Sequence, residues 1–168
     1  MIEVKKAGIE QINGIIQVCS DGYRDTYRET HTDEYIERMI KEFYYYERIY
    51  QEVTDTSSGW DGWYVAVEDG TVVGAIGGGL IGEHQAEVFV LYLDPKRQRE
   101  GIGSTLLQAL TEVQRQNGAT EQWVSVAKGN RKGISFYEAK QFQFIQEQPS
   151  FANSDNETYV SLRYCRMI

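Results

Sequence analysis

Residues 88–113 hold the chain's clearest grouping of features that could bind a phosphate. An apolar run, Val88–Leu93, is followed by a basic loop ending in Gly101-Ile102-Gly103, and then by apolar residues at helical spacing. Glycines at a strand-to-helix junction let the backbone approach a ligand closely, because no Cβ intervenes. The first turn of a helix has unpaired N–H groups, and the helix dipole attracts anions to that end. This segment therefore predicts a phosphate-binding turn.

Two common nucleotide-binding motifs are excluded by their spacing. A Walker A loop requires Gly-x-x-x-x-Gly-Lys-Ser/Thr, but Ser104 follows Gly103 directly and the lysine is missing. A dinucleotide fingerprint requires a third glycine, and Gly103 is followed by Ser-Thr-Leu. The run Gly77-Gly78-Gly79 precedes no predicted helix. A different phosphate-bearing ligand has to be considered.

Hydrophobic periodicity predicts the elements that position this turn. Asp69-Gly70 between two β-type runs predicts a hairpin, and Asn117-Gly118 is a natural helix stop. Thr32 is a good helix N-cap, whereas Asp21-Gly22 is expected to interrupt the helix that begins near Ile9. The predicted strands are 2–7, 63–68, 71–76, 86–93, 121–127, 142–145 and 158–164, and the predicted helices begin near residues 9, 32, 102 and 130.

This order of elements predicts an α+β, three-layer fold. We expect a mixed, mostly antiparallel central sheet with helices on both faces, formed by a single domain spanning residues 1–168. Three consecutive tyrosines, Tyr44, Tyr45 and Tyr46, cannot all face one side of a helix, so at least one should stand away from the core. It could cover a neighbouring loop or line a substrate pocket.

Composition limits the class of partner. A formal net charge of −8 and a sequence pI near 4.8 argue against nucleic acid binding, which needs a basic face. The charge suits a cationic substrate, although it also serves solubility alone. Cys19 and Cys165 lack metal-ligand spacing, so we predict no metal site. No signal peptide or bilayer-spanning run is present, so we expect a cytoplasmic protein without a membrane partner.

Two motifs at the expected separation carry a family resemblance. Gln98–Gly103 matches Gln/Arg-x-x-Gly-x-Gly/Ala, and with Leu91–Pro95 before it this stretch resembles the coenzyme A-binding motif of the GCN5-related N-acetyltransferase (GNAT) superfamily. Asn130, then 135–138 (Ser-Phe-Tyr-Glu) and Phe142, resemble the second signature, Asn-x-x-Ala-x-x-x-Tyr-Glu-x-x-Gly-Phe. The resemblance covers nearly the whole chain and implies the acyl-CoA N-acyltransferase-like fold.

Two departures from the second signature stand out. Gln141 replaces the usual glycine before the phenylalanine, and Gly133 stands near the place of the alanine. The first implies a different turn between helix and strand, with Gln141 or Lys140 in a left-handed conformation.

The resemblance implies a set of cofactor-binding residues. Backbone N–H groups of the turn should hold the pyrophosphate, and the motif strand should pair with pantetheine like an added strand. The charged side chains of Lys96, Arg97 and Arg99 could meet phosphates or could be solvated loop charges. The residues implied in cofactor binding are Leu91, Tyr92 and Leu93 on the strand, Gln98, Arg99, Glu100, Gly101, Ile102, Gly103 and Ser104 in the turn, and Asn130 after it.

The resemblance also implies catalytic roles. Tyr137 matches the position whose hydroxyl protonates the leaving thiolate, and a phenol with pKa near 10 suits a thiol with pKa around 8.5. Glu87 lies where relatives often carry a glutamate that deprotonates the amine through water. Glu83 and His84 are rivals for that role, and Glu87 itself could be a solvent-facing edge residue.

We therefore predict an N-acetyltransferase that moves acetyl from acetyl-CoA to a primary amine by direct attack, without a metal. A small metabolite such as a polyamine suits the negative charge and compact size. The alternatives are a peptide or protein N-acetyltransferase and a non-catalytic CoA-binding sensor. A homodimer is compatible with such a domain.

Overall fold

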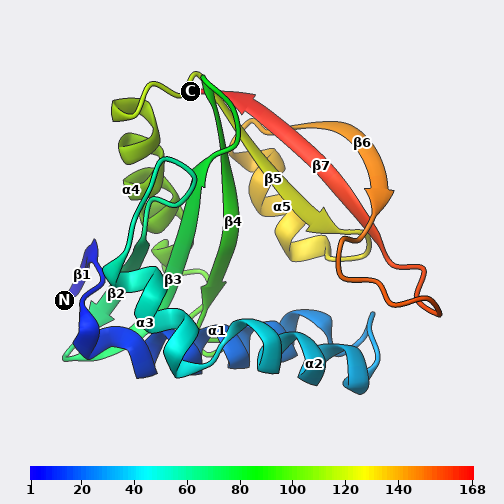
Figure 1. The fold of residues 1–168 in the computed structure, drawn as a ribbon, viewed down its shortest axis with the longest axis horizontal. Helices are drawn as coiled ribbons and strands as arrows, with labels where there is room; N and C mark the ends of the chain where they lie inside the picture. Colours follow the sequence, from blue (N-terminus) through cyan, green and yellow to red (C-terminus); the bar gives the residue numbers. More distant parts are fainter.

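Seven strands form one sheet in the order β1-β2-β3-β4-β5-β7-β6 in the computed structural model, which describes all 168 residues (Figure 1). All neighbouring pairs are antiparallel except β4 and β5. The predicted fold class is confirmed. The strands are β1 (Ile2–Lys6), β2 (Trp63–Glu68), β3 (Thr71–Leu80), β4 (Gln85–Leu93), β5 (Glu121–Ala127), β6 (Gln143–Pro149) and β7 (Val160–Met167).

Helices cover both faces of the sheet because its strands alternate apolar residues between them. Val65 and Ala75 pack in one buried cluster with Ile15 of α1, whereas their chain neighbours Ala66 and Ile76 pack in another with α4. No helix is long and apolar enough to cross a membrane. The helices are the short 3-10 turn η1 (Ile9–Gln11), α1 (Ile12–Tyr27), α2 (Asp33–Phe43), α3 (Tyr46–Thr54), α4 (Ile102–Gln116) and α5 (Arg131–Ala139).

Two local predictions about helices are wrong. Helix α1 continues through Asp21-Gly22, because Gly22 serves close packing: a Cβ there would lie 2.8 Å from the Cβ of Tyr92 on β4. One helix was expected to run from Thr32 through the three tyrosines. Instead, the helix that Thr32 caps ends at Phe43, and α3 starts separately at Tyr46. Thr32 Oγ1 accepts a hydrogen bond from the Tyr35 N–H at 3.1 Å, as predicted.

The break between α2 and α3 resolves the conflict among the three consecutive tyrosines. Tyr44 leaves the helical conformation and packs against the buried clusters. Tyr45 and Tyr46 remain 46% and 44% exposed.

The glycine run in β3 brings a second backbone close to the strand. A Cβ on Gly79 would lie 2.0 Å from the carbonyl oxygen of Gly59, and one on Gly77 would lie 2.5 Å from the Trp60 ring. The β3–β4 register shifts between Gly77 and Gly78, so Phe89 of β4 is left without a partner in a bulge. A bulge bends and twists its strand, and this one lies where β4 begins to leave β5.

Strands β4 and β5 pair over only a short stretch, from Gln85 opposite Glu121 to Val88 opposite Val124. Beyond Val88 they diverge, as Figure 1 shows, with β4 running toward α1 and β5 toward α5 and the loop before β7. The second half of β4 therefore has a strand partner on its β3 side only.

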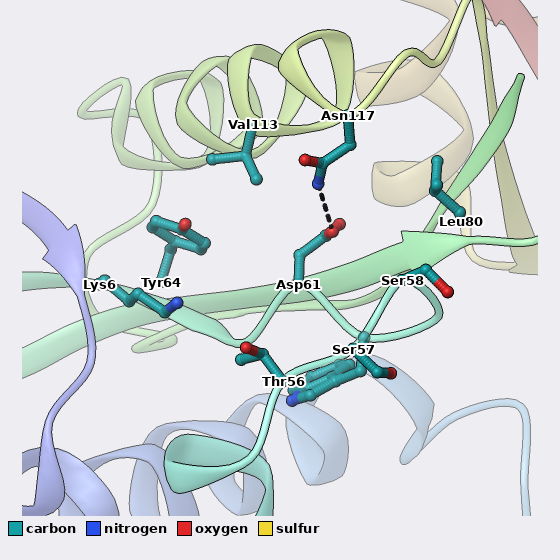
Figure 2. Close-up of a pocket in the computed structure, with 10 residues that line it drawn as sticks. Lys6, Thr56, Ser57, Ser58, Asp61, Tyr64, Leu80, Val113 and Asn117 are labelled. Carbon is teal, nitrogen blue, oxygen red and sulfur yellow. Dashed lines mark hydrogen bonds between the residues drawn. The ribbon is translucent and has the colours of Figure 1, made fainter.

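A buried polar network fixes β4 just before the divergence. Gln114 of α4 is fully buried, and its Nε2 donates to the Glu87 carbonyl at 3.0 Å and to the Asp61 carboxylate at 3.2 Å. Gln122 of β5 donates to the Gln114 side-chain oxygen at 2.9 Å. Asp61 also accepts from Asn117 at 3.2 Å and lies in a polar cavity of about 480 Å³ (Figure 2). Burial raises the pKa of Asp61, whose partners here are neutral amides.

Replacing Gln114 tests this network. Gln114→Leu removes the side-chain donor to the Glu87 carbonyl and one of the two amide donors to the Asp61 carboxylate, and we expect a loss of about 2 kcal/mol in the free energy of unfolding. Denaturant unfolding followed by tryptophan fluorescence measures it. Gln108→Leu, on the exposed side of the same helix, is the matched control and should change stability little. Equal stability of the two variants would contradict a structural role for the network.

Candidate functional site

The unpaired edge of β4 begins at the Phe89 bulge, and the Gly101 turn lies at its far end. Leu91 and Leu93 pair with Ile76 and Gly74 of β3, so their strand is held from one side while the other side lacks a strand partner. Backbone polar groups at such an edge need hydrogen-bond partners. The edge suits an extended ligand that adds itself as a strand. Pantetheine pairing at Leu91, Tyr92 and Leu93 stays a prediction.

The turn before α4 has a left-handed backbone at two positions. Gly101 has φ +80° and precedes the first turn of α4, and Arg99, a non-glycine residue, also has positive φ (+67°). Ile102 and Gly103 are buried, whereas Gln98, Arg99, Glu100 and Gly101 are exposed. The first N–H groups of this helix have no intrahelical partner, and the helix follows directly on the exposed turn.

Protein side chains hold the loop in this shape. Arg97 donates to Glu68 at 2.7 Å and to Glu100 at 2.8 Å, which ties the loop to the end of β2. The sequence left open whether Arg97 meets a phosphate, and in the structure both sides of its guanidinium are engaged by carboxylates. Gln98 accepts from Lys132 Nζ of α5 at 3.0 Å. Lys132 was not singled out by the sequence, and it brings a further positive charge to the turn.

Helix α5 carries Asn130 and Tyr137 on the other side of the gap between the strands. Asn130 caps the helix, since its Oδ1 accepts from the Gly133 N–H at 3.0 Å. A Cβ on Gly133 would lie 2.6 Å from Asn130 Nδ2, which explains a glycine at this place. Gln141 has φ +72°, so the left-handed turn expected at Gln141 or Lys140 is found at Gln141.

Tyr137 is 8% exposed and packs edge-on against Phe136 and Phe142, with ring centroids 5.1 and 5.2 Å away. Burial raises its pKa above the ordinary value, and the nearby Tyr27 adds to the effect. The phenol therefore stays protonated across the neutral and alkaline range, which is the form a proton donor needs.

An aromatic cavity of about 690 Å³ lies on the α1 face of β4. Helices α1, α2 and α3, the strands β4 and β5, and the segment joining β6 and β7 all contribute to it. Its volume is in the range of small-molecule sites. We call it the aromatic cavity, and its aromatic side chains are Tyr23, Tyr27, His31, Tyr35, Phe43, Tyr44, Trp60, Trp63, Phe89, Tyr92 and Phe151.

The tyrosines of the aromatic cavity remain neutral. Burial raises the pKa of Tyr23, Tyr27, Tyr35, Tyr44 and Tyr92. Neutral, electron-rich rings attract a cation to their faces.

Two carboxylates also line the aromatic cavity, and each has an arginine partner. Glu87 is bound by Arg163 of β7 at 2.9 Å, and Arg163 also donates to Ser125 at 2.9 Å. Glu52 of α3 accepts from Arg48 at 3.1 Å and from the Trp63 indole at 3.0 Å. Glu87 thus faces the cavity rather than open solvent. The rivals Glu83 and His84 lie exposed in the β3–β4 turn, and neither lines the cavity.

Comparison with known proteins decides the family. The sequence profile of the Acetyltransferase (GNAT) family matches residues 19–144. Spermidine N(1)-acetyltransferase of Thermoplasma acidophilum is 33% identical over 137 residues, which cover 81% of this chain and 84% of that protein. The chain belongs to the GNAT acetyltransferase family.

Two further relatives agree with this assignment. The crystal structure of PaiA N-acetyltransferase from T. acidophilum in complex with coenzyme A superposes with a TM-score of 0.82 at 28% identity, covering 97% of this chain and 98% of that chain. The uncharacterised N-acetyltransferase YuaI of Bacillus subtilis is 32% identical over 146 residues, 83% of this chain and 79% of that protein. This GNAT protein is an acetyl-CoA-dependent N-acetyltransferase, and its co-substrate is acetyl-CoA.

The residues that the sequence predicted for this GNAT enzyme lie in two places, at the gap between β4 and β5 and at the aromatic cavity. The cofactor residues border the gap between β4 and β5, and Glu87 lies on the cavity side. Tyr137 lies beside the gap but does not line the cavity. The roles predicted for these residues remain predictions. Sequence reasoning missed most of the cavity wall, in particular His31, Glu52 and Arg48, because only the packing of α1–α3 onto β4 brings them together.

An ion pair joins α2 to the segment before β7, and both of these contribute residues to the wall of the aromatic cavity. Arg38 binds Glu157 at 2.6 Å, and Glu157 also accepts from the Ser154 N–H at 2.8 Å. These contacts lower the pKa of Glu157 to about 2 from 4.5. A carboxyl with a lowered folded-state pKa stabilises the protein above its ordinary pKa, and the stabilisation is lost as pH falls through the folded pKa.

Melting temperatures of Glu157→Gln over a range of pH test the Arg38–Glu157 ion pair. We expect the variant to melt at a lower temperature than the wild type between pH 5 and 7. The difference should shrink as pH falls from 4.5 toward 2, where the wild-type carboxyl is also protonated. Differential scanning fluorimetry measures both melting temperatures. Glu29→Gln, an exposed glutamate in the turn after α1, is the control and should show no such difference. A pH-independent gap between Glu157→Gln and the wild type would contradict the assignment.

Proposed function

We propose that this GNAT enzyme acetylates a primary amine of a small polyamine-like metabolite, and that residues 1–168 act as one such domain. The observation that carries the proposal is the aromatic cavity, which lies against β4 at the point where the strand leaves β5. An acceptor in the cavity lies on one side of β4, and a thioester held along the free edge of the strand lies within reach of it. Direct attack needs this kind of proximity.

The chemistry of the cavity wall supports a cationic, partly aliphatic acceptor. Neutral tyrosine and tryptophan faces bind ammonium groups by cation–π attraction and also pack against methylene chains. Glu52 and Glu87 supply carboxylates that can accept hydrogen bonds from an amine. The relative from T. acidophilum is a spermidine N(1)-acetyltransferase, which agrees with an acceptor of this type.

The predicted cofactor site supports the same reaction from the other side. We propose that backbone N–H groups from Gln98 to Ser104 hold the pyrophosphate and that Leu91–Leu93 pair with pantetheine. Asn130 fixes the start of α5, and through it the position of Tyr137. Tyr137 then protonates the leaving thiolate, and Glu87 meets the incoming amine. The raised pKa of Tyr137 keeps the proton on the phenol until the thiolate forms.

A panel of acceptors tests the function. Thiol release from acetyl-CoA is followed with spermidine, spermine, putrescine, a monoamine and a peptide with a free N-terminal amine. We expect kcat/KM to be at least about tenfold higher for polyamines than for the peptide, because aromatic faces and two carboxylates favour a flexible polycation. A preference for the peptide would assign the enzyme to protein N-termini. Tight CoA binding without release from any amine would indicate a sensor.

Tyr137→Phe tests the proton donor. We expect kcat to fall by about 10²-fold or more, because a general acid contributes that much, while the Kd for CoA stays unchanged. Steady-state kinetics and calorimetric CoA titration give the two quantities. Tyr45→Phe, which removes an exposed phenol, is the matched control and should leave kcat as it is. Unchanged turnover in Tyr137→Phe would remove this residue from the mechanism.

A further inference from the structure

His31 is the one imidazole in the aromatic cavity, and it has no role in the function proposed above. It lies in the turn between α1 and α2 and lines the cavity together with Glu87, Phe89 and Val90. We propose that His31 is the general base that removes a proton from the acceptor's ammonium group. This inference rests on the proposed amine site in that cavity.

His31 packs against the last residue of α1. Its ring lies 4.9 Å from the Tyr27 ring, centroid to centroid. The same turn touches the loop after β5, because a Cβ on Gly129 would lie 3.3 Å from Thr30 Cγ2. The imidazole therefore neighbours the open end of the gap between β4 and β5.

The ring is fixed in orientation and keeps one nitrogen available. It stacks on Tyr159 at 3.9 Å with an interplanar angle of 21°, and it lies 4.8 Å from the Tyr35 ring. Nδ1 is 2.8 Å from Thr30 Oγ1, and Nε2 has no protein partner. When Nδ1 carries the proton and donates it to Thr30, Nε2 presents a lone pair for accepting a proton.

The surroundings keep the imidazole neutral. Burial lowers the pKa of His31, and the carboxylate of Glu157 acts in the opposite direction more weakly. Glu157 is itself held by Arg38, which reduces its influence. The other titratable groups against the ring are the phenols of Tyr27, Tyr35 and Tyr159, and burial raises the pKa of Tyr27 and Tyr35. A neutral imidazole at pH 7 can accept a proton, whereas an imidazolium cannot.

Glu87 differs from His31 in this respect. Its carboxylate is already bound by Arg163 at 2.9 Å, so receiving a proton means giving up an ion pair. His31 receives a proton without breaking any charged contact. We therefore assign Glu87 to holding the ammonium group and His31 to deprotonating it.

Each proton of the reaction is accounted for by His31, Tyr137 and solvent. His31 takes one proton from R–NH₃⁺, and the amine lone pair then forms the C–N bond as the thioester carbonyl opens. The C–S bond breaks with its electron pair on sulfur, and the thiolate takes the Tyr137 proton. The surplus proton on the new amide nitrogen returns to Tyr137, and the His31 proton leaves to solvent. The products are the acetylated amine, CoA thiol and one proton.

The test is the pH dependence of kcat in the wild type, His31→Gln and His84→Gln, with the best acceptor from the panel. For the wild type, kcat should fall as the pH drops below a single apparent pKa that lies under 6.5, which gives the profile an acid limb. His31→Gln should lose that limb and about 10²-fold in kcat at pH 7, with KM nearly unchanged. Its deficit should narrow as pH rises toward the pKa of the amine, where free amine no longer needs a base. His84→Gln, which removes the chain's other histidine from an exposed turn, should behave as wild type.

Two further arms separate the possible failures. If the wild type acetylates no amine, the proposed function fails, and the role of His31 fails with it. If the wild type is active and His31→Gln keeps its acid limb, only the inference about His31 is overturned. Loss of the limb in Glu87→Gln instead would assign the base to Glu87. CoA binding and the melting temperature of His31→Gln, measured alongside, should match the wild type, which separates a lost base from a collapsed cavity wall.

Discussion

The architecture depends on the short pairing between β4 and β5. Four residues of each strand are in register, and then the strands part. A strand interior that loses a neighbour exposes N–H and C=O groups, which are costly to bury and a hazard to leave as an edge. At this place β4 is held by β3 on one side and by the Gln114 amide, which donates to the carbonyl of Glu87. Where it leaves β5, β4 is therefore held by β3 and α4, and its other edge faces the gap.

The glycine run explains how β4 can bend at that point. Gly77–Gly79 let the Gly59 and Trp60 segment lie directly on β3, and the register shift beside them places Phe89 in a bulge. The bulge lies at the residue after the last β4–β5 pair. The irregularity therefore lies where the edge of β4 opens, and it places the Phe89 side chain, 47% exposed, in the wall of the aromatic cavity.

Local sequence patterns predicted the parts of the protein whose structure is determined locally. The Asp69-Gly70 hairpin needs positive φ at both residues, and they have φ values of +50° and +80°. Asn130 and Thr32 cap their helices through contacts three residues away. The motif turn, the strand order around it and the sheet class follow from similarly short-range signals, together with the family resemblance.

What the sequence did not reveal depends on contacts between distant segments. Gly22 resembles a helix stop until Tyr92, seventy positions later, is found against it. His31 stacks on Tyr159, and Arg38 binds Glu157, so one wall of the cavity forms only when the segment before β7 folds over α2. Glu87 resembled an edge residue because its partner Arg163 lies on a strand that is not adjacent in sequence or in the sheet. Hydrophobic periodicity predicts which face of an element a residue lies on, but it does not predict which distant residue contacts it.

Burial shifts Tyr23, Tyr27, Tyr92 and His31 of the aromatic cavity in the same direction, toward the neutral form. It raises the pKa of the tyrosines and lowers that of His31. The charged side chains that line the cavity are Arg48, Glu52 and Glu87. Glu52 pairs with Arg48, and Glu87 pairs with Arg163 of β7. An ammonium group entering such a cavity meets aromatic faces and two balanced carboxylates, so it is attracted without being held so strongly that losing a proton becomes unfavourable. That balance is what a reaction needs when its nucleophile must arrive as a cation and attack as a neutral amine.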